Sequence, residues 1–190
     1  ITNDDSITIS INDVSVVDLQ TATITATWAT RSSPRAIAIA PNDLALFVAT
    51  RNRVTALDVL RPARLVELDL QNTLIDATGV AVSRDGTKLF ITHRTNVTGN
   101  LATFVTMINL SDATVAACLR NRTDPCNPGP GEILLSVPFT GLEHVAVSPW
   151  DGSIWVVSSQ GRIARAATPG AAFVEVPTAV NQRPPNPGGM

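Results

Sequence analysis

The chain has 190 residues, of which 44% are hydrophobic and 16% are charged, and its 16 acidic and 14 basic residues leave a net charge of −2. This length is sufficient to bury a sizeable core in one or two domains. The nearly neutral balance provides no basic surface for nucleic acid, and no apolar run approaches the roughly 18 residues that a membrane span requires. We therefore expect neither a nucleic-acid partner nor a membrane-spanning segment.

Residues 1–33 predict outer strands without a complete sheet. Residues 14–19 and 24–28 are rich in Val, Ile and Thr, which favour strands, and the residues between them suit a turn. Residues 7–11 offer one further strand. We interpret this segment as the outer part of an incomplete structural unit.

Three later segments repeat one pattern. Each begins with alternating small and branched apolar residues, continues through a tight turn and ends in a second apolar strand. The three copies are residues 36–50, 79–93 and 144–158. Asp-Gly in two of the turns accepts the positive φ of a β-hairpin, and a third and a fourth apolar strand follow each copy. Tandem repeats of four antiparallel strands predict an all-β chain of β-propeller blades with negligible helix.

The repeats divide the chain into units of unequal length. The equivalent residues Ala40, Ser83 and Ser148 show that the second interval is longer than the first by about twenty residues, and we expect the excess to form an inserted loop. The expected units are outer strands of an incomplete blade at 1–33, a blade at 34–76, a blade with an inserted loop (115–131) at 77–140, a blade at 141–176 and a Pro/Gly-rich tail at 177–190.

Two cysteines, Cys118 and Cys126, lie within the predicted insertion. A metal site would need a Cys-x-x-Cys pair or a nearby histidine, and the insertion has neither. A disulfide across this short loop is sterically reasonable, and disulfides persist in oxidising compartments. We therefore predict a Cys118–Cys126 disulfide and an extracellular or periplasmic location.

The repeat pattern also resembles a known family. It reads NDVSVVDLQTATITATW followed by SPRAIAIAPNDLALFVAT, and later GVAVSRDGTKLFITH followed by FVTMINLSDATV. Over residues 10–176 this pattern resembles the YVTN family of β-propeller repeats. The resemblance implies a closed ring of about seven blades, of which this chain holds about three and a half. The rest of a longer polypeptide, a protein partner or a second copy would then complete the ring, and a tight four-bladed ring is a further alternative.

The innermost strands of a propeller line a central channel, where ligands often bind. Arg35, Thr78 and His144 lie near the starts of the three predicted innermost strands, so we expect them to surround one mouth of the channel, with Glu143 beside them. Adjacent strand residues point to opposite faces, so Glu143 and His144 do not form a metal site together. Trp150 lies in a turn and is predicted as an exposed aromatic residue.

No catalytic or cofactor motif accompanies these residues. The Gly-x-Ser-x-Gly motif of hydrolases and the Cys-x-x-Cys-His motif of c-type haem attachment are missing, so we assign no catalytic residue, metal or cofactor. We expect an exported protein-interaction or assembly scaffold that is non-catalytic by itself and that can form homo-oligomers through open sheet edges. The alternative is the propeller portion of a periplasmic or extracellular enzyme or redox complex, similar to lactonases or to dehydrogenase subunits.

Overall fold

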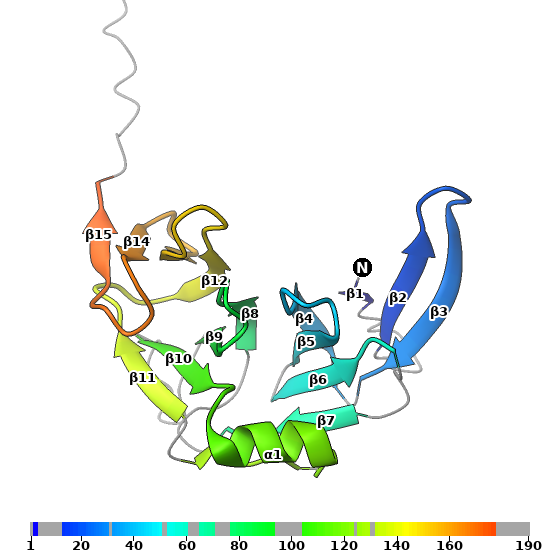
Figure 1. Cartoon of the computed structure of the whole chain (residues 1–190). Helices are drawn as coiled ribbons and strands as arrows, with labels where there is room; N and C mark the ends of the chain where they lie inside the picture. The colour runs from blue at the N-terminus through cyan, green and yellow to red at the C-terminus, as the bar shows by residue number, and fades with distance from the viewer. Residues whose placement is uncertain are drawn as a thin grey trace, which may run out of the picture.

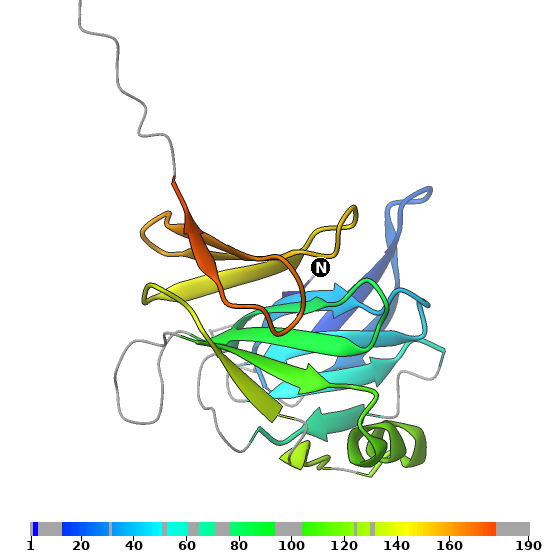
Figure 2. The same ribbon diagram turned by 60° about the vertical axis from the view of Figure 1, so that its left-hand side comes forward.

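In the described residues, four antiparallel sheets follow one another along the chain and stand side by side in the same order (Figure 1). The computed structural model describes residues 2–3, 13–30, 32–50, 53–60, 65–70, 77–93, 104–123, 125–129 and 132–177. Strands that are neighbours in a sheet are consecutive in the sequence. Figure 2 shows that the sheets are stacked against one another.

The strand bounds follow the repeats. The first sheet contains β1 (Thr2–Asn3), β2 (Asp13–Asp18) and β3 (Thr23–Ala29). The second sheet contains β4 (Pro34–Ile39), β5 (Ala45–Thr50), β6 (Val54–Asp58) and β7 (Leu65–Leu68). The third sheet contains β8 (Ala77–Val82), β9 (Lys88–His93), β10 (Phe104–Asn109) and β11 (Glu132–Ser136). The fourth sheet contains β12 (Leu142–Val147), β13 (Ile154–Ser158), β14 (Ile163–Ala166) and β15 (Val174–Val176). The prediction of an all-β chain with four-stranded antiparallel sheets is confirmed.

The three repeated hairpins close with similar local chemistry. Each tip contains one residue with positive φ and one short polar side chain that accepts a hydrogen bond, 3.0–3.1 Å long, from the backbone N–H two residues further on. The positive-φ residues are Asp43, Gly86 and Gly152, and the accepting side chains belong to Asn42, Asp85 and Asp151. The turn residues predicted from the sequence therefore close the three hairpins as expected.

The segment after β10 differs from the expectation, because it contains an α-helix, α1 (Ala113–Asn121). The sequence predicted a loop over 115–131 and negligible helix. Asp112 caps the helix by accepting hydrogen bonds from the N–H groups of Thr114 and Val115, and Arg122 ends it in the left-handed conformation. A run of good helix formers around Ala116 then favours this structure over a loop.

The sheets pack through two alternating faces. We call the face that a sheet turns toward the following sheet its front face, and the opposite face its back face. The front face of the second sheet packs on the back face of the third, with Phe47 and Ile91 in one buried core. The front face of the third sheet packs on the back face of the fourth, with Phe90 and Ile154 in another. The same interface is therefore built twice within this chain.

The innermost strands approach closely, and glycine makes this possible at one point. The strand β8 packs against both β4 and β12. A Cβ atom on Gly79 would lie 2.7 Å from Thr92 Oγ1, 3.0 Å from the backbone nitrogen of Val145 and 3.1 Å from the carbonyl oxygen of Glu143. A side chain at this position would therefore separate the third sheet from the fourth.

The insertion carrying α1 reaches back to the second sheet. The predicted Cys118–Cys126 disulfide is present, with Cα atoms 5.6 Å apart. The N–H of Cys126 donates to the carbonyl oxygen of Glu67, and the N–H of Asp69 donates to the carbonyl oxygen of Cys126, each at 2.7 Å. Residues of the insertion in the third sheet thereby pair with the outer strand β7, which has no other strand at this edge in the described part of the chain.

In the described part of the chain, no helix is long and apolar enough to cross a membrane.

Candidate functional site

The starts of the innermost strands share an irregularity that positions three of the predicted channel residues. Each strand has a register shift after its first residue, and Arg35, Thr78 and Glu143 are the residues within these shifts. Glu143 is therefore equivalent to Arg35 and Thr78. His144 lies one position further, where the other two strands have Ala36 and Gly79. The grouping of Arg35 and Thr78 with His144 thus needs correction, because the position that directly precedes Ala36 and Gly79 corresponds to Glu143 in β12.

The four residues have different surroundings. Arg35 and His144 are exposed, whereas Thr78 and Glu143 are half-buried. The hydroxyl oxygen of Thr78 lies 3.2 Å from Thr92 Oγ1 and 3.2 Å from the carbonyl oxygen of Leu142. Thr92 in turn donates to the carbonyl oxygen of Glu143 at 3.3 Å. Thr78 therefore helps to join the innermost strands of the third and fourth sheets.

The second histidine of the sequence is a core residue. His93 is 2% exposed, and its Nε2 lies 3.0 Å from Thr106 Oγ1. Burial lowers the pKa of His93 to about 4, so the imidazole is neutral near pH 7. Among the described residues there is no group of three or more His, Cys, Asp or Glu side chains that could hold a metal ion.

A surface that sequence reasoning missed lies on the fourth sheet. Its front face is not covered by another sheet in the described part of the chain (Figure 1). The pairing registers make Trp155 equivalent to Phe47 and Phe90, which are 2% and 0% exposed. We call this surface the open front face; its residues are His144, Ala146, Trp155, Val157, Ile163, Arg165, Val174 and Val176. Trp155 is half-buried here, and Val174 is 67% exposed, against 44% for the equivalent Ile133 of the third sheet.

Polar groups partly cover the open front face. The guanidinium of Arg165 lies over the Trp155 ring, 5.5 Å from its centroid, and pairs with Asp151 at 2.6 Å. The indole N–H of Trp155 donates to Ser153 Oγ at 2.9 Å. Arg165 occupies the position of Ala56 and Met107 in the two covered front faces. The sequence signal that could have revealed this difference is one charged residue in an otherwise apolar strand position.

A second open apolar surface lies at the other end of the stack. Val14 of the first sheet packs against Leu46, Val48 and Leu57 on the back face of the second sheet. Opposite β4, the first sheet has only the two-residue strand β1 among the described residues, and Ile37 of β4 is 39% exposed, whereas its equivalents Val80 and Val145 are 6% and 8% exposed. Both ends of the stack therefore expose apolar residues at positions that are buried between the sheets.

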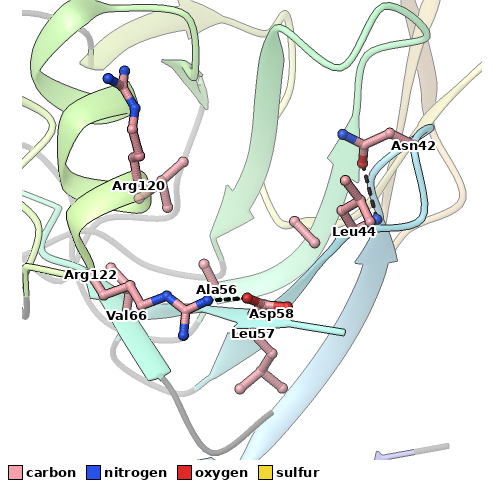
Figure 3. A pocket seen from close by; sticks show the side chains of 10 residues that line it. Asn42, Leu44, Ala56, Leu57, Asp58, Val66, Arg120 and Arg122 are labelled. Atoms are coloured by element: carbon pink, nitrogen blue, oxygen red, sulfur yellow. Dashed lines mark hydrogen bonds and ion pairs between the residues drawn. The ribbon is translucent and has the colours of Figure 1, made fainter. Parts of the chain in front are cut away.

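A cavity lies between the end of α1 and the second sheet (Figure 3). Its volume is about 590 Å³, and its walls come from the β4–β5 turn, from β5, β6 and β7, and from the last turn of the helix. Arg122 forms an ion pair with Asp58 at its base, and Figure 3 shows Arg120 extending from the helix at its rim. Leu44, on the opposite side, is 50% exposed.

A smaller cavity of about 370 Å³ lies between two hairpin tips that contain Asp85 and Asp151. Hydrogen bonds from Ser83 and then Thr87 lower the pKa of Asp85 to about 2. Hydrogen bonds from Ser148 and Ser153 likewise lower the pKa of Asp151. Both carboxylates are thus engaged in closing their own turns. Trp150, beside this cavity, is 86% exposed.

The sheets and their stacking define a β-sheet-rich protein with a propeller-like fold. Among solved structures, the chain is similar to the hydrazine synthase of Kuenenia stuttgartiensis, with a TM-score of 0.62 at 17% identity over 86% of this chain and 42% of that one. It is also similar to U3-55K, with a TM-score of 0.55 at 12% identity over 77% of this chain and 39% of that one. At such identities the likeness shows the fold alone, and the chain spans less than half the length of either structure.

No family model matches the chain, and no curated protein matches it.

Proposed function

We propose that this chain is one sector of a larger β-propeller of YVTN-type repeats, and that it serves as an exported protein-interaction or assembly scaffold that is non-catalytic by itself. The open front face carries the proposal. It repeats, position by position, two front faces that other sheets of this chain cover. A further four-stranded sheet, from the rest of a longer polypeptide, from a partner or from a second copy, would cover it in the same manner.

Physical chemistry supports this reading of the open front face. Exposed side chains such as Val174 and the half-buried Trp155 lose contact with water when another sheet packs on them, and this burial is favourable by about 25 cal/mol per Å² of apolar surface. Arg165 can remain over the indole ring as a cation–π partner during such packing. A mixed apolar and cationic surface of this kind is typical of protein–protein interfaces.

Two further observations agree with the proposal. Both similar structures are longer than this chain, which corresponds to 42% and 39% of them, so additional protein beside the matched part has a precedent. The Cys118–Cys126 disulfide is expected in an oxidising compartment, which supports an extracellular or periplasmic location.

The experiment is a comparison of two exposed alanines. Ala146 lies on the open front face, and Ala167 lies in a turn outside it. We expect the isolated chain to self-associate in light scattering, because its open faces can pack on one another. Ala146→Glu should weaken this association by placing a charge in the contact, whereas Ala167→Glu should leave it unchanged. A chain that stays monomeric at high concentration, or an association that Ala146→Glu does not alter, would contradict the proposal.

A further inference from the structure

The inner side of the first sheet differs from that of the second and third sheets. The strands β6 and β10 pair with a neighbour on both edges along nearly their whole length. Among the described residues, β2 pairs with β3 along its whole length but with β1 only at Asp13 and Val14. The inner edge of β2 from Val16 to Asp18 therefore has no neighbouring strand in the described part of the chain. Such an edge can pair with a strand of another polypeptide.

The ends of β2, β6 and β10 show which residues of the three sheets correspond. Asp18, Asp58 and Asn109 end these strands, and the side chain of each accepts a hydrogen bond, 2.7–3.2 Å long, from the backbone N–H two residues further on. Residues two positions before these three ends are therefore equivalent. These residues are Val16, Ala56 and Met107.

In the other three sheets, an aromatic residue of the second strand lies opposite this position. The pairs are Phe47 with Ala56, Phe90 with Met107 and Trp155 with Arg165. Phe47 and Phe90 belong to the buried cores between the second and third sheets and between the third and fourth sheets. Among the described residues, only Val16 has no aromatic residue opposite it on the inner edge.

The back face of β4 is open beside this edge. Ile37 is 39% exposed and Ile39 is 51% exposed, whereas Val80 and Val145, the equivalents of Ile37, are buried between sheets. Figure 1 shows the short strand β1 between β4 and β2. The branched side chains of β4 are therefore uncovered on the side where an aromatic residue opposite Val16 would lie.

The contact between β8 and β12 shows what covers an innermost strand. Small residues of β8, Gly79 and Ala81, share the face that β8 turns toward β12. A Cβ atom on Gly79 would lie 3.0 Å from the backbone nitrogen of Val145, and Ala81 lies in the same core as Val145. A segment that repeats this contact on β4 therefore needs small residues in its first strand and an aromatic residue in its second strand.

We propose that the first sheet binds a β-hairpin of another polypeptide segment at a site that we call the β2–β4 site. It consists of Val16 and Val17 on the inner edge of β2 and of Ile37 and Ile39 on β4. The second strand of the hairpin pairs with β2 and places an aromatic side chain over Ile37, and its first strand places small residues against β4. The packing of β8 on β12 and of β4 on β8 is continued by this hairpin.

This proposal names a partner for a surface other than the open front face. The β2–β4 site lies at the opposite end of the stack, so it holds whether or not another sheet covers Trp155. The partner has the pattern of the chain's own repeated hairpins, in which small and branched residues alternate before a tight turn and an aromatic residue follows it. Burial of the aromatic ring and of the two isoleucines provides the affinity, and pairing with β2 provides the alignment.

The first test titrates the intact, isotope-labelled chain with an unlabelled synthetic peptide of sequence ATGVAVSRDGTKLFITH, which is that of residues 77–93. The peptide should shift the backbone amide resonances of Val16, Val17, Ile37 and Ile39 in NMR spectra. A peptide of the same composition in shuffled order should not shift them. Equal shifts with both peptides, or no shifts at these four residues, would overturn the proposal.

Two altered peptides test the aromatic residue. Phe90→Ser in the peptide should weaken binding by about tenfold or more, because the ring is no longer buried on β4. Leu89→Ser is the control, since adjacent residues of a strand point to opposite faces and Leu89 would point away from β4. It should change the affinity by less than about twofold. Equal losses from the two changes would contradict the proposed orientation of the hairpin.

Two altered chains test the site itself. Ile37→Thr keeps a residue that suits a strand but reduces the apolar surface, so peptide affinity should fall several-fold. Ile133→Thr is the matched control, because Ile133 is 44% exposed on β11 of the third sheet, and it should leave the affinity unchanged. Unchanged affinity with Ile37→Thr would refute the proposal.

A third altered chain separates this proposal from that of the open front face. Ala146→Glu places a charge on the open front face and weakens association there, but it should leave peptide affinity unchanged. Loss of peptide binding in this variant would show that the peptide lies on the open front face, and the β2–β4 site would be wrong. Light scattering and peptide titration thus report on the two surfaces separately.

Discussion

The third and fourth sheets are built from the same pattern but differ in what covers them. Phe90 in the third sheet is fully buried, because the fourth sheet packs on its front face. Trp155 occupies the equivalent position in the fourth sheet and is half-buried, with Arg165 in place of a further apolar residue. Alternating apolar residues and turn residues determine that a sheet forms. The position of the sheet in the stack determines which of its apolar residues are buried.

The largest effect is expected from truncating the equivalent aromatic residues. Phe90→Ala should lower the free energy of unfolding by about 3–5 kcal/mol, because it leaves a cavity between the packed third and fourth sheets. Trp155→Ala should cost less than half as much, since its ring has no sheet packed over it. Urea unfolding of the two variants measures the difference. Equal losses would mean that the open front face is covered in solution.

The buried His93 and the exposed His144 allow buried and exposed positions to be compared through the pH dependence of stability. The buried His93 has a folded-state pKa of about 4 and an unfolded-state value near 6.5, so the unfolded chain binds the proton more readily. Its contribution to stability is complete above pH 6.5 and is lost as the pH falls from 6.5 towards 4. The loss amounts to about 3 kcal/mol.

Measurement of unfolding free energy between pH 4 and 7.5 tests this prediction. The variant His93→Gln should lose that part of the pH dependence, whereas substitution of the exposed His144 by Asn should keep it. A parent chain whose stability does not change between pH 6.5 and 4.5 would contradict the assignment of His93 as a neutral core residue.

The smallest of the three effects concerns the innermost strands. Gly79→Ala should destabilise the chain by about 1–3 kcal/mol, because the new methyl group would meet Thr92 and the backbone of β12 at 2.7–3.1 Å. His144→Ala, at the equivalent position of the exposed fourth sheet, should change stability by less than about 0.5 kcal/mol. Thermal unfolding compares the two, and a neutral Gly79→Ala variant would show that the sheets can separate without penalty.

The sequence predicted the parts of this fold that depend on local chemistry. Alternating strands, hairpin tips at Asp85 and Asp151, and the Cys118–Cys126 bridge all follow from residues close together in the chain. The Pro- and Gly-rich end of the insertion favours a loop, whereas the capping residue Asp112 and the residues after it favour the helix that the structure contains. The equivalence of Glu143 with Arg35 and Thr78 could be predicted, because each directly precedes the first residue of its repeat.

The candidate sites were less predictable, since they depend on contacts between distant segments. The open front face differs from the covered ones in sequence mainly by Arg165, and the stacking order is what leaves Trp155 half-buried. The cavity below α1 joins residues from three strands and a helix that the sequence did not place together. Whether another sheet covers a given sheet depends on the whole assembly and not on the sequence of its strands.

The pairing of Cys126 with β7 has a consequence for the order in which the molecule matures. Synthesis proceeds from the amino terminus, so β4 to β7 are complete long before Cys126 leaves the ribosome. Until then the carbonyl of Glu67 and the amide of Asp69 lack their later partner and remain available to other chains. The second sheet is therefore completed by a residue of the third sheet, and an interruption of synthesis before Cys126 would leave an adhesive intermediate rather than a smaller stable protein.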